Sequence, residues 1–183
     1  MTLLQTERLI LRPWQDRDRE LFHRINRDDR VMEFFPMRRN RAESDALMDR
    51  LNADFAEFDY GFGAIELRET GEAIGFCGLR PVTGMAPVVP DGTPEIGWRL
   101  APEFWGKGYV TEAARAWLDL GFDRFNFPEI WSFAVSTNER SLAVMRRLGF
   151  THTGSFDHPA VPATHPELVR HELYCLKSSL EAG

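Results

Sequence analysis

The N-terminal part of the chain changes from a strand-like to a helix-like pattern of apolar residues. Over residues 7–14 apolar and polar positions alternate, with Leu9 and Leu11 on one face, which predicts a strand that Pro13 stops. Asp16 is placed to cap a following helix. That helix would bury an apolar stripe formed by Leu21, Phe22 and Ile25.

A capping-box spacing predicts where a second helix begins. Asn40 is followed three residues later by Glu43, so that each side chain can accept a hydrogen bond from the other residue's backbone N–H. Apolar residues then follow at helical intervals, at Leu47, Leu51, Phe55 and Phe58. We therefore expect a long helix directly after residue 40.

The rest of the chain alternates between strand-like and helix-like runs. Residues 62–68 and 72–82 predict a hairpin that turns at Gly71. A Pro- and Gly-rich segment, residues 84–94, is long enough for a lid or a partner contact. Further strands are expected at residues 95–100, 130–136, 150–156 and 168–177, and further helices at residues 113–122 and 139–148.

Composition and charge narrow the class of protein. The chain has 183 residues, 43% hydrophobic and 27% charged, which predicts one globular domain over residues 1–183 with its core at about 6–177. With 22 Lys and Arg against 28 Asp and Glu, the net charge of −6 disfavours nucleic-acid and anionic-membrane partners and favours a cationic small molecule or peptide. No membrane-spanning or export segment is apparent, so a cytoplasmic location is expected.

The cysteines and histidines do not form a metal-binding pattern. Cys77 and Cys175 lie far apart in apolar runs, so we expect two buried, unpaired thiols. Four histidines match no standard ligand spacing and are expected on loop and strand surfaces: His152, His158, His165 and His171. No metal is therefore predicted.

A turn with two glycines follows the strand at residues 95–100 and leads into a helix. Gly106 and Gly108 allow consecutive backbone N–H groups and the helix N-terminus to converge on an anion such as a pyrophosphate. A P-loop is excluded because Gly108 stands where Ser or Thr must bind magnesium, and the dinucleotide fingerprint fails at Thr111. Taken alone, the two glycines are equally compatible with a simple tight turn.

Two further motifs extend the pattern of this turn. The block W-G-K-G-Y-V-T-E-A is followed by Asn138, Ser141 and an L-G-F sequence, and the chain opens with T-E-R-L-I-L-R-P. Together these blocks resemble the GNAT superfamily of acetyl-coenzyme A-dependent N-acetyltransferases, in the branch of the ribosomal-protein N-terminal acetyltransferases. The resemblance implies an α/β (α+β) fold, with a central, twisted, mainly antiparallel mixed sheet of about six to seven strands and flanking helices. It also implies acetyl-coenzyme A as cosubstrate.

The resemblance places the cofactor on two segments. The family motif [RQ]-x-x-G-x-[GA] falls on residues 103–108, although Glu103 departs from it. The pyrophosphate would bind the backbone of five residues, Gly106, Lys107, Gly108, Tyr109 and Val110. The pantetheine arm would pair with the main chain of the strand at residues 95–100, with Trp98 and Leu100 as contact positions.

The catalytic assignment departs from many family members, which carry a Tyr where this chain has Met145. A thioether cannot donate a proton. By resemblance, Ser141 hydrogen-bonds the coenzyme A sulfur and Asn138 contacts the pantetheine or orders a water; the alternatives are a surface serine and a plain N-cap. Glu95 is the candidate base, or else a solvated carboxylate, and Glu112 is expected to be structural.

These assignments predict direct transfer of acetyl to a primary amine in a ternary complex. The alternative is a catalytically silent coenzyme A-binding or interaction protein. The acceptor stays open among a protein N-terminus, a polyamine, an aminoglycoside and an amino-acid-like metabolite, and a homodimer stays open as well. The aromatic and acidic run at residues 28–35 lies, in this family's fold, on the acceptor side and could help to receive a cation.

Overall fold

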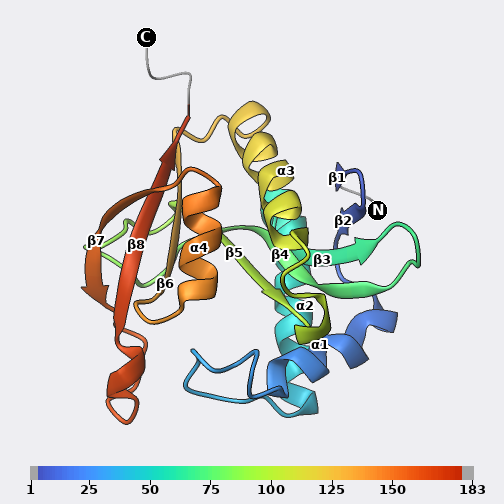
Figure 1. Cartoon of the computed structure of the whole chain (residues 1–183), viewed down its shortest axis with the longest axis horizontal. Helices are drawn as coiled ribbons and strands as arrows, with labels where there is room; N and C mark the ends of the chain where they lie inside the picture. The colour runs from blue at the N-terminus through green and yellow to red at the C-terminus, as the bar shows by residue number, and fades with distance from the viewer. Residues whose placement is uncertain (1–3, 179–183) are drawn as a thin grey trace. The chain divides into compact units, whose positions relative to one another are not determined.

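The computed structural model describes residues 4–178. Within them lie four α-helices, α1 (Arg19–Arg27), α2 (Arg41–Phe58), α3 (Tyr109–Asp123) and α4 (Glu139–Arg147) (Figure 1). The strands are β1 (Leu4–Gln5), β2 (Leu9–Arg12), β3 (Phe62–Leu67), β4 (Ala73–Pro81), β5 (Pro94–Leu100), β6 (Glu129–Val135), β7 (Thr151–Asp157) and β8 (Arg170–Lys177).

The strands follow the order β1-β2-β3-β4-β5-β6-β8-β7. β5 pairs with β6 in parallel, whereas β2 with β3, β3 with β4, and β8 with both β6 and β7 are antiparallel. The predicted mixed, mainly antiparallel sheet is confirmed. It has eight strands in the described chain rather than six to seven, because the two-residue β1, too short to show alternation, pairs with β2.

The described residues form two compact units, each built from two segments of the sequence. The first contains residues 4–80 and 97–117, and the second contains residues 81–96 and 118–178. β5 and α3 each run from one unit into the other.

In the first unit, α1 and α2 lie side by side and cover an apolar cluster (Figure 1). The predicted capping box of α2 is confirmed: Oδ1 of Asn40 accepts from the N–H of Glu43, and Oε2 of Glu43 accepts from the N–H of Asn40, both at 2.9 Å. The β3–β4 hairpin turns at Gly71 with φ of 69°, as expected. The core of this unit includes Trp14, Phe22, Ile25, Met48, Leu51 and Phe76.

The start of α1 differs from the prediction. Asp16 does not cap it; the chain first makes a short 3-10 turn, Asp16–Asp18, and the carboxylate of Asp18 accepts from the N–H of Gln15 at 2.8 Å. Asp18 is buried because it also pairs with Arg12 of β2, at 2.6 Å. A charge pair distant from the helix pattern therefore determines where this helix begins.

In the second unit, β6, β8 and β7 lie in antiparallel register with α4 against β6 (Figure 1). The segment at residues 84–94 packs into this unit's core through Met85 and Val89, both buried. Two backbone hydrogen bonds close it, from Val82 to Thr93 and from Gly92 to Val82, both at 2.8 Å. This segment is a packed loop that presents Val88 to solvent.

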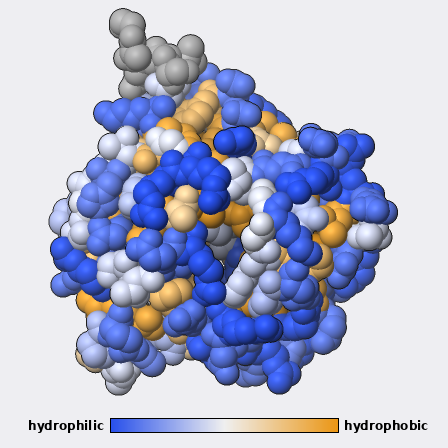
Figure 2. All heavy atoms as spheres, viewed as in Figure 1, coloured by the Kyte–Doolittle hydropathy of each residue, from blue (hydrophilic) through white to orange (hydrophobic). Residues whose placement is uncertain are grey.

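Hydrophilic residues predominate on the face of the molecule in Figure 2, and hydrophobic residues appear there as scattered patches. Within residues 4–178, none of the helices has the length and apolar character needed to cross a membrane.

Candidate functional site

The glycine turn ahead of α3 has the backbone conformation that the sequence predicted. Gly106 and Gly108 have φ of 74° and 80°, in the left-handed region that residues with a Cβ rarely adopt. A Cβ added at Gly106 would meet nothing within 4 Å, so the space beside this residue is open. The Nε1 of Trp105 donates to the carbonyl of Leu100 at 2.9 Å and ties the turn to the end of β5.

Five consecutive backbone donors in this turn have no acceptor. Among the described residues, no oxygen accepts a hydrogen bond from the N–H groups of Gly106, Lys107, Gly108, Tyr109 and Val110. Further into α3, the N–H of Glu112 donates to the carbonyl of Gly108 at 3.0 Å. These donors lie at the N-terminus of a 15-residue helix, which carries a partial positive charge. The turn therefore fits the pyrophosphate of coenzyme A.

Arg8 supports the turn from outside. Its Nη1 donates to the carbonyl of Lys107 at 3.0 Å, its Nε pairs with Glu112 at 2.6 Å, and its guanidinium lies 4.6 Å from the ring centre of Tyr109. Thr6 donates to the other oxygen of Glu112 at 2.5 Å. In the sequence this T-E-R stretch was significant only as part of the family resemblance. In the structure its residues Thr6 and Arg8 stabilise the glycine turn through Lys107 and Glu112.

Glu112 is the centre of this support. Burial would raise the pKa of its carboxyl, but hydrogen bonds from Thr6, the N–H of Arg8 and the Arg8 side chain outweigh burial and lower the pKa. The ionised carboxylate therefore links the entry of β2 to the first turn of α3. This agrees with the structural role expected for Glu112.

The predicted pantetheine positions lie on β5. Trp98 is half-buried and the side chain of Leu100 is buried, so Leu100 offers a cofactor its main chain rather than its side chain. The Leu100 carbonyl already accepts from Trp105. Contact with the pantetheine stays a prediction for both residues.

In the second unit, Asn138 and Ser141 lie together at the start of α4. Oδ1 of Asn138 accepts from the backbone N–H of Ser141 at 3.2 Å, so Asn138 is the N-cap and keeps its amide nitrogen as a donor. Ser141 is half-buried in the first helical turn. Met145, 1% exposed, packs into the core.

Glu95, the candidate base, is the second residue of β5 and lies opposite Trp131 of β6. It is half-buried rather than fully solvated. Its role as a base stays a prediction.

Both cysteines are buried and unpaired, as expected. Burial raises the pKa of the Cys77 thiol far above its usual range. Burial, followed by the charge of Glu129, raises the pKa of Cys175 to about 12. Since the nucleophile is the thiolate, neither cysteine is poised to form a covalent acetyl intermediate.

The histidine prediction was wrong for one residue and partly wrong for another. His171 is 8% exposed and His158 is half-buried, and their rings lie 4.8 Å apart against Phe133 and Phe156. Burial and then His171 lower the pKa of His158 to about 4, and burial lowers that of His171. Aromatic packing, which local spacing does not reveal, explains the difference. Across the described chain, no group of three or more His, Cys, Asp or Glu side chains could hold a metal.

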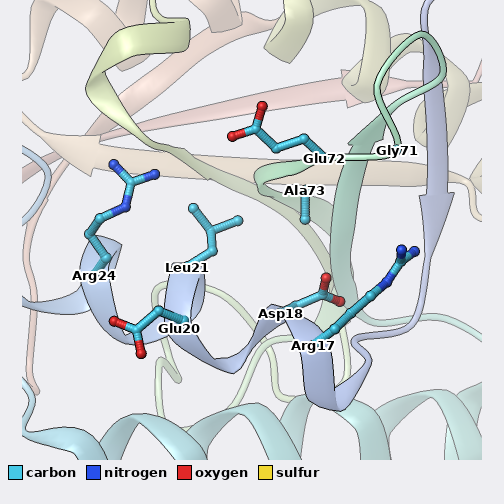
Figure 3. Close-up of a pocket in the computed structure, with 8 residues that line it drawn as sticks. All are labelled: Arg17, Asp18, Glu20, Leu21, Arg24, Gly71, Glu72 and Ala73. Carbon is cyan, nitrogen blue, oxygen red and sulfur yellow. The ribbon is translucent and has the colours of Figure 1, made fainter.

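A separate hollow of about 340 Å³ lies in the first unit, where α1 faces the β3–β4 turn (Figure 3). Its two arginines pair with residues outside the lining: Arg17 with Glu66, and Arg24 with Glu103. None of the predicted site residues lines it, and we assign it no role. Its lining is Arg17, Asp18, Glu20, Leu21, Arg24, Gly71, Glu72 and Ala73.

Comparison with known proteins agrees with this geometry. The model of the acetyltransferase (GNAT) domain matches residues 8–151. The FsC-acetyl coenzyme A-N(2)-transacetylase of Aspergillus fumigatus is 31% identical over 156 residues, which are 84% of this chain and 66% of that protein.

Solved structures share the fold. An acetyltransferase from Agrobacterium tumefaciens, 29% identical, matches with a TM-score of 0.76 over 96% of this chain and 94% of that one. RimL, a ribosomal L7/L12 alpha-N-protein acetyltransferase solved in complex with coenzyme A, matches at 14% identity with a TM-score of 0.77, over 97% of this chain and 98% of that one. The predicted fold and family are therefore confirmed. The chain belongs to the GNAT family of acetyltransferases, which use acetyl-coenzyme A to acetylate amines.

Proposed function

We propose that this protein transfers the acetyl group of acetyl-coenzyme A directly to a primary amine, with both substrates bound at once. The observation that carries the proposal is the run of five N–H groups from Gly106 to Val110 at the start of α3, for which the described residues provide no acceptor. An array of backbone donors at a helix N-terminus is suited to a pyrophosphate. The turn needs no particular side chain for this, so the departure at Glu103 does not weaken it.

Bound acetyl-coenzyme A supplies an activated thioester, and this chain's own residues bind, orient and move protons. The turn holds the pyrophosphate, while Arg8 and Glu112 keep the turn in shape. The Ser141 hydroxyl donates a hydrogen bond to the departing sulfur, and Asn138 orients the cofactor arm through its amide nitrogen. Glu95 accepts the proton that the amine must lose.

A neutral amine is required for attack, and this favours an α-amine over a lysine side chain. Deprotonation at pH 7 costs about 1 kcal/mol for an α-amine and about 4.6 kcal/mol for a lysine, given pKa values near ~7.8 and ~10.4. Direct transfer is also supported by the two buried cysteines with raised pKa values, Cys77 and Cys175. A covalent acetyl-cysteine would need an accessible thiolate.

The competing function is coenzyme A binding without catalysis. Met145 favours it, because this position has no proton donor for the leaving thiolate. Both functions predict coenzyme binding. They differ in whether free thiol appears when an amine is present.

Thiol release from acetyl-coenzyme A, with mass detection of the product, tests the proposal across peptides and small amines.

Ser141→Ala should lower kcat by about 10²-fold with little change in the KM for acetyl-coenzyme A, because the hydrogen bond acts mainly in the transition state. Ser155→Ala, an exposed hydroxyl on β7, is the matched control and should keep full turnover. Coenzyme binding without thiol release from any amine would favour the silent function, and wild-type turnover in Ser141→Ala would return Ser141 to a surface role.

A further inference from the structure

Arg99 on β5 is held by a hydrogen bond and two aromatic rings, but no carboxylate of residues 4–178 pairs with it. Its Nη1 donates to Oδ1 of Asn26 at 2.5 Å, and its guanidinium lies 4.4 Å and 5.3 Å from the ring centres of Phe35 and Phe76. Asn26 is fully buried, and its Nδ2 donates to the carbonyl of Phe22 at 2.7 Å, which orients Oδ1. The Nε of Arg99 is buried and has no hydrogen-bond partner in the described part of the chain.

A second arginine, Arg39, lies close to Arg99. Its backbone N–H donates to the carbonyl of Asn26 at 3.1 Å, so both arginines are tied to the same residue. Its Nε is also buried, with no partner among the residues described. Burial, followed by the charge of Arg39, lowers the pKa of Arg99 to about 10. No ion pair within residues 4–178 includes either guanidinium.

Carboxylates of the surrounding segments are already neutralised by other arginines. The pairs are Asp28 with Arg30 at 2.7 Å, Asp29 with Arg38 at 2.8 Å, and Glu103 with Arg24 at 2.6 Å. Arg39 and Arg99 therefore form a local excess of positive charge. Two like charges in a partly buried site repel each other, and an anion between them would relieve that cost.

The setting of this arginine pair connects it with the acceptor. Arg99 stands between Trp98 and Leu100, the two residues of β5 predicted to contact the pantetheine arm. Since side chains alternate along a strand, Arg99 projects from the same side of β5 as Gly97. A Cβ added at Gly97 would meet the ring of Phe62, which stacks on Phe76 under the Arg99 guanidinium.

Apolar surface is exposed in the segment that carries Arg39. Phe35 and Met37 are 40% and 43% exposed. A ligand of the arginine pair would therefore find a large apolar contact in Phe35, which also stacks on Arg99.

We propose that Arg39 and Arg99 bind an oxyanion of the acceptor, a carboxylate or a phosphate, so that the enzyme acetylates an amine that also carries an acidic group. A guanidinium presents a planar set of donors that matches both oxyanions. In Arg99, Nη1 donates to Asn26, and Nε has no partner among the described residues. The inference rests on the proposed function. It reverses the expectation that residues 28–35 receive a cation, because the acids there already have partners.

Matched pairs of amines test this inference by thiol release. L-methionine against L-methioninamide tests a carboxylate, glucosamine 6-phosphate against glucosamine tests a phosphate, and spermidine is the cationic comparison. In at least one pair the acidic member should have a kcat/KM about tenfold or more above its neutral partner, the contribution of one charge-assisted hydrogen bond. Turnover of neutral amines or spermidine with equal or better efficiency would overturn the inference.

Variants assign the preference to the arginine pair. Arg99→Gln and Arg39→Gln should reduce the kcat/KM of the acidic amine toward that of its neutral partner. Arg38→Gln is the matched control, because Arg38 neighbours Arg39 in sequence but pairs with Asp29, and it should keep the preference. A preference that survives both Arg99→Gln and Arg39→Gln would contradict the assignment.

A binding measurement separates this inference from the proposed function. In calorimetry with coenzyme A present, the wild-type protein should bind N-acetyl-L-methionine or N-acetylglucosamine 6-phosphate about tenfold tighter than the corresponding neutral compound, and Arg99→Gln should not. If no amine releases thiol but this preference holds, the proposed function fails and the anion site stands. If amines are acetylated but acid and neutral compounds bind equally, or neither binds, the anion site fails alone.

Discussion

Two arginines on strands of the first unit, Arg12 and Arg99, differ in how their charge is met. Arg12 is 3% exposed and bonds to Asp18 at 2.6 and 3.0 Å and to Glu66 at 2.7 Å; burial would lower its pKa, but these partners outweigh burial and raise it. Within residues 4–178, Arg99 has a hydrogen bond to the neutral Asn26 and no carboxylate partner, and burial, followed by the charge of Arg39, lowers its pKa to about 10. The charge of Arg12 is therefore neutralised by carboxylates of the described chain, whereas the charge of Arg99 is not.

The largest expected effect on the free energy of unfolding is at Arg12, whose charge is paired with buried carboxylates. Arg12→Met should lower the free energy of unfolding by about 3–5 kcal/mol, because it leaves Asp18 and Glu66 buried without their main partner. Arg17→Met removes an exposed partner of the same Glu66 and should cost less than ~1 kcal/mol. Urea unfolding of both variants provides the measurement. Equal, small losses would show that the Arg12 network is not a buried structural unit.

His158 and His171 in the second unit are ionisable groups whose pKa values are lowered by burial, which favours their neutral form. Because the folded-state pKa of His158 is about 4 and its unfolded value is near ~6.5, its contribution is fully present above about pH 6.5 and is lost as pH falls toward about 4. The loss should be on the order of 1–3 kcal/mol. The free energy of unfolding should be measured at several pH values for the wild type and for His158→Phe. The difference between the two proteins gives the contribution of His158 separately from the titration of carboxylates. Parallel pH profiles for the two proteins would contradict the assignment.

The smallest effect on the free energy of unfolding is expected at Arg99, which has no carboxylate partner among the described residues. Arg99→Gln should lower the free energy of unfolding by no more than about 1 kcal/mol, since the loss of the donor to the buried Oδ1 of Asn26 is offset by the removal of repulsion with Arg39. Urea unfolding beside Arg12→Met gives the contrast directly. A loss of several kcal/mol at Arg99 would mean that it holds the fold as Arg12 does, and would break the comparison.

Sequence predicted the elements whose signals are local. The capping box at Asn40 and Glu43 and the turn at Gly71 were correct because each depends on residues within a few positions. The prediction that Asp16 caps α1 was wrong because Asp18, which pairs with Arg12, lies at the start of this helix. The prediction that His171 is exposed was wrong because aromatic rings from other strands bury it.

The candidate site divides in the same way. The turn at residues 106–110 takes its conformation from Gly106 and Gly108, both in the left-handed region, so a pair of glycines was enough to predict it. The contact between Arg8 and Glu112, which stabilises this turn, joins residues 104 positions apart in the sequence. The hydrogen bond from Arg99 to Asn26 joins residues 73 positions apart. Such pairings follow from sheet order and helix packing, which no short motif encodes.

Coenzyme A binding by two matched glycine variants tests the central claim, that unpartnered N–H groups of the turn bind the cofactor's pyrophosphate. Gly106 and Gly71 have similar φ of 74° and 69°, and an added Cβ would meet nothing within 4 Å at either, so Gly106→Ala and Gly71→Ala should cost similar stability. By calorimetry, Gly106→Ala should bind coenzyme A about tenfold or more weakly, because it adds a methyl group beside the N–H groups proposed to bind the pyrophosphate. Gly71→Ala should bind coenzyme A as the wild type does. Equal affinity in the two folded variants would contradict the claim.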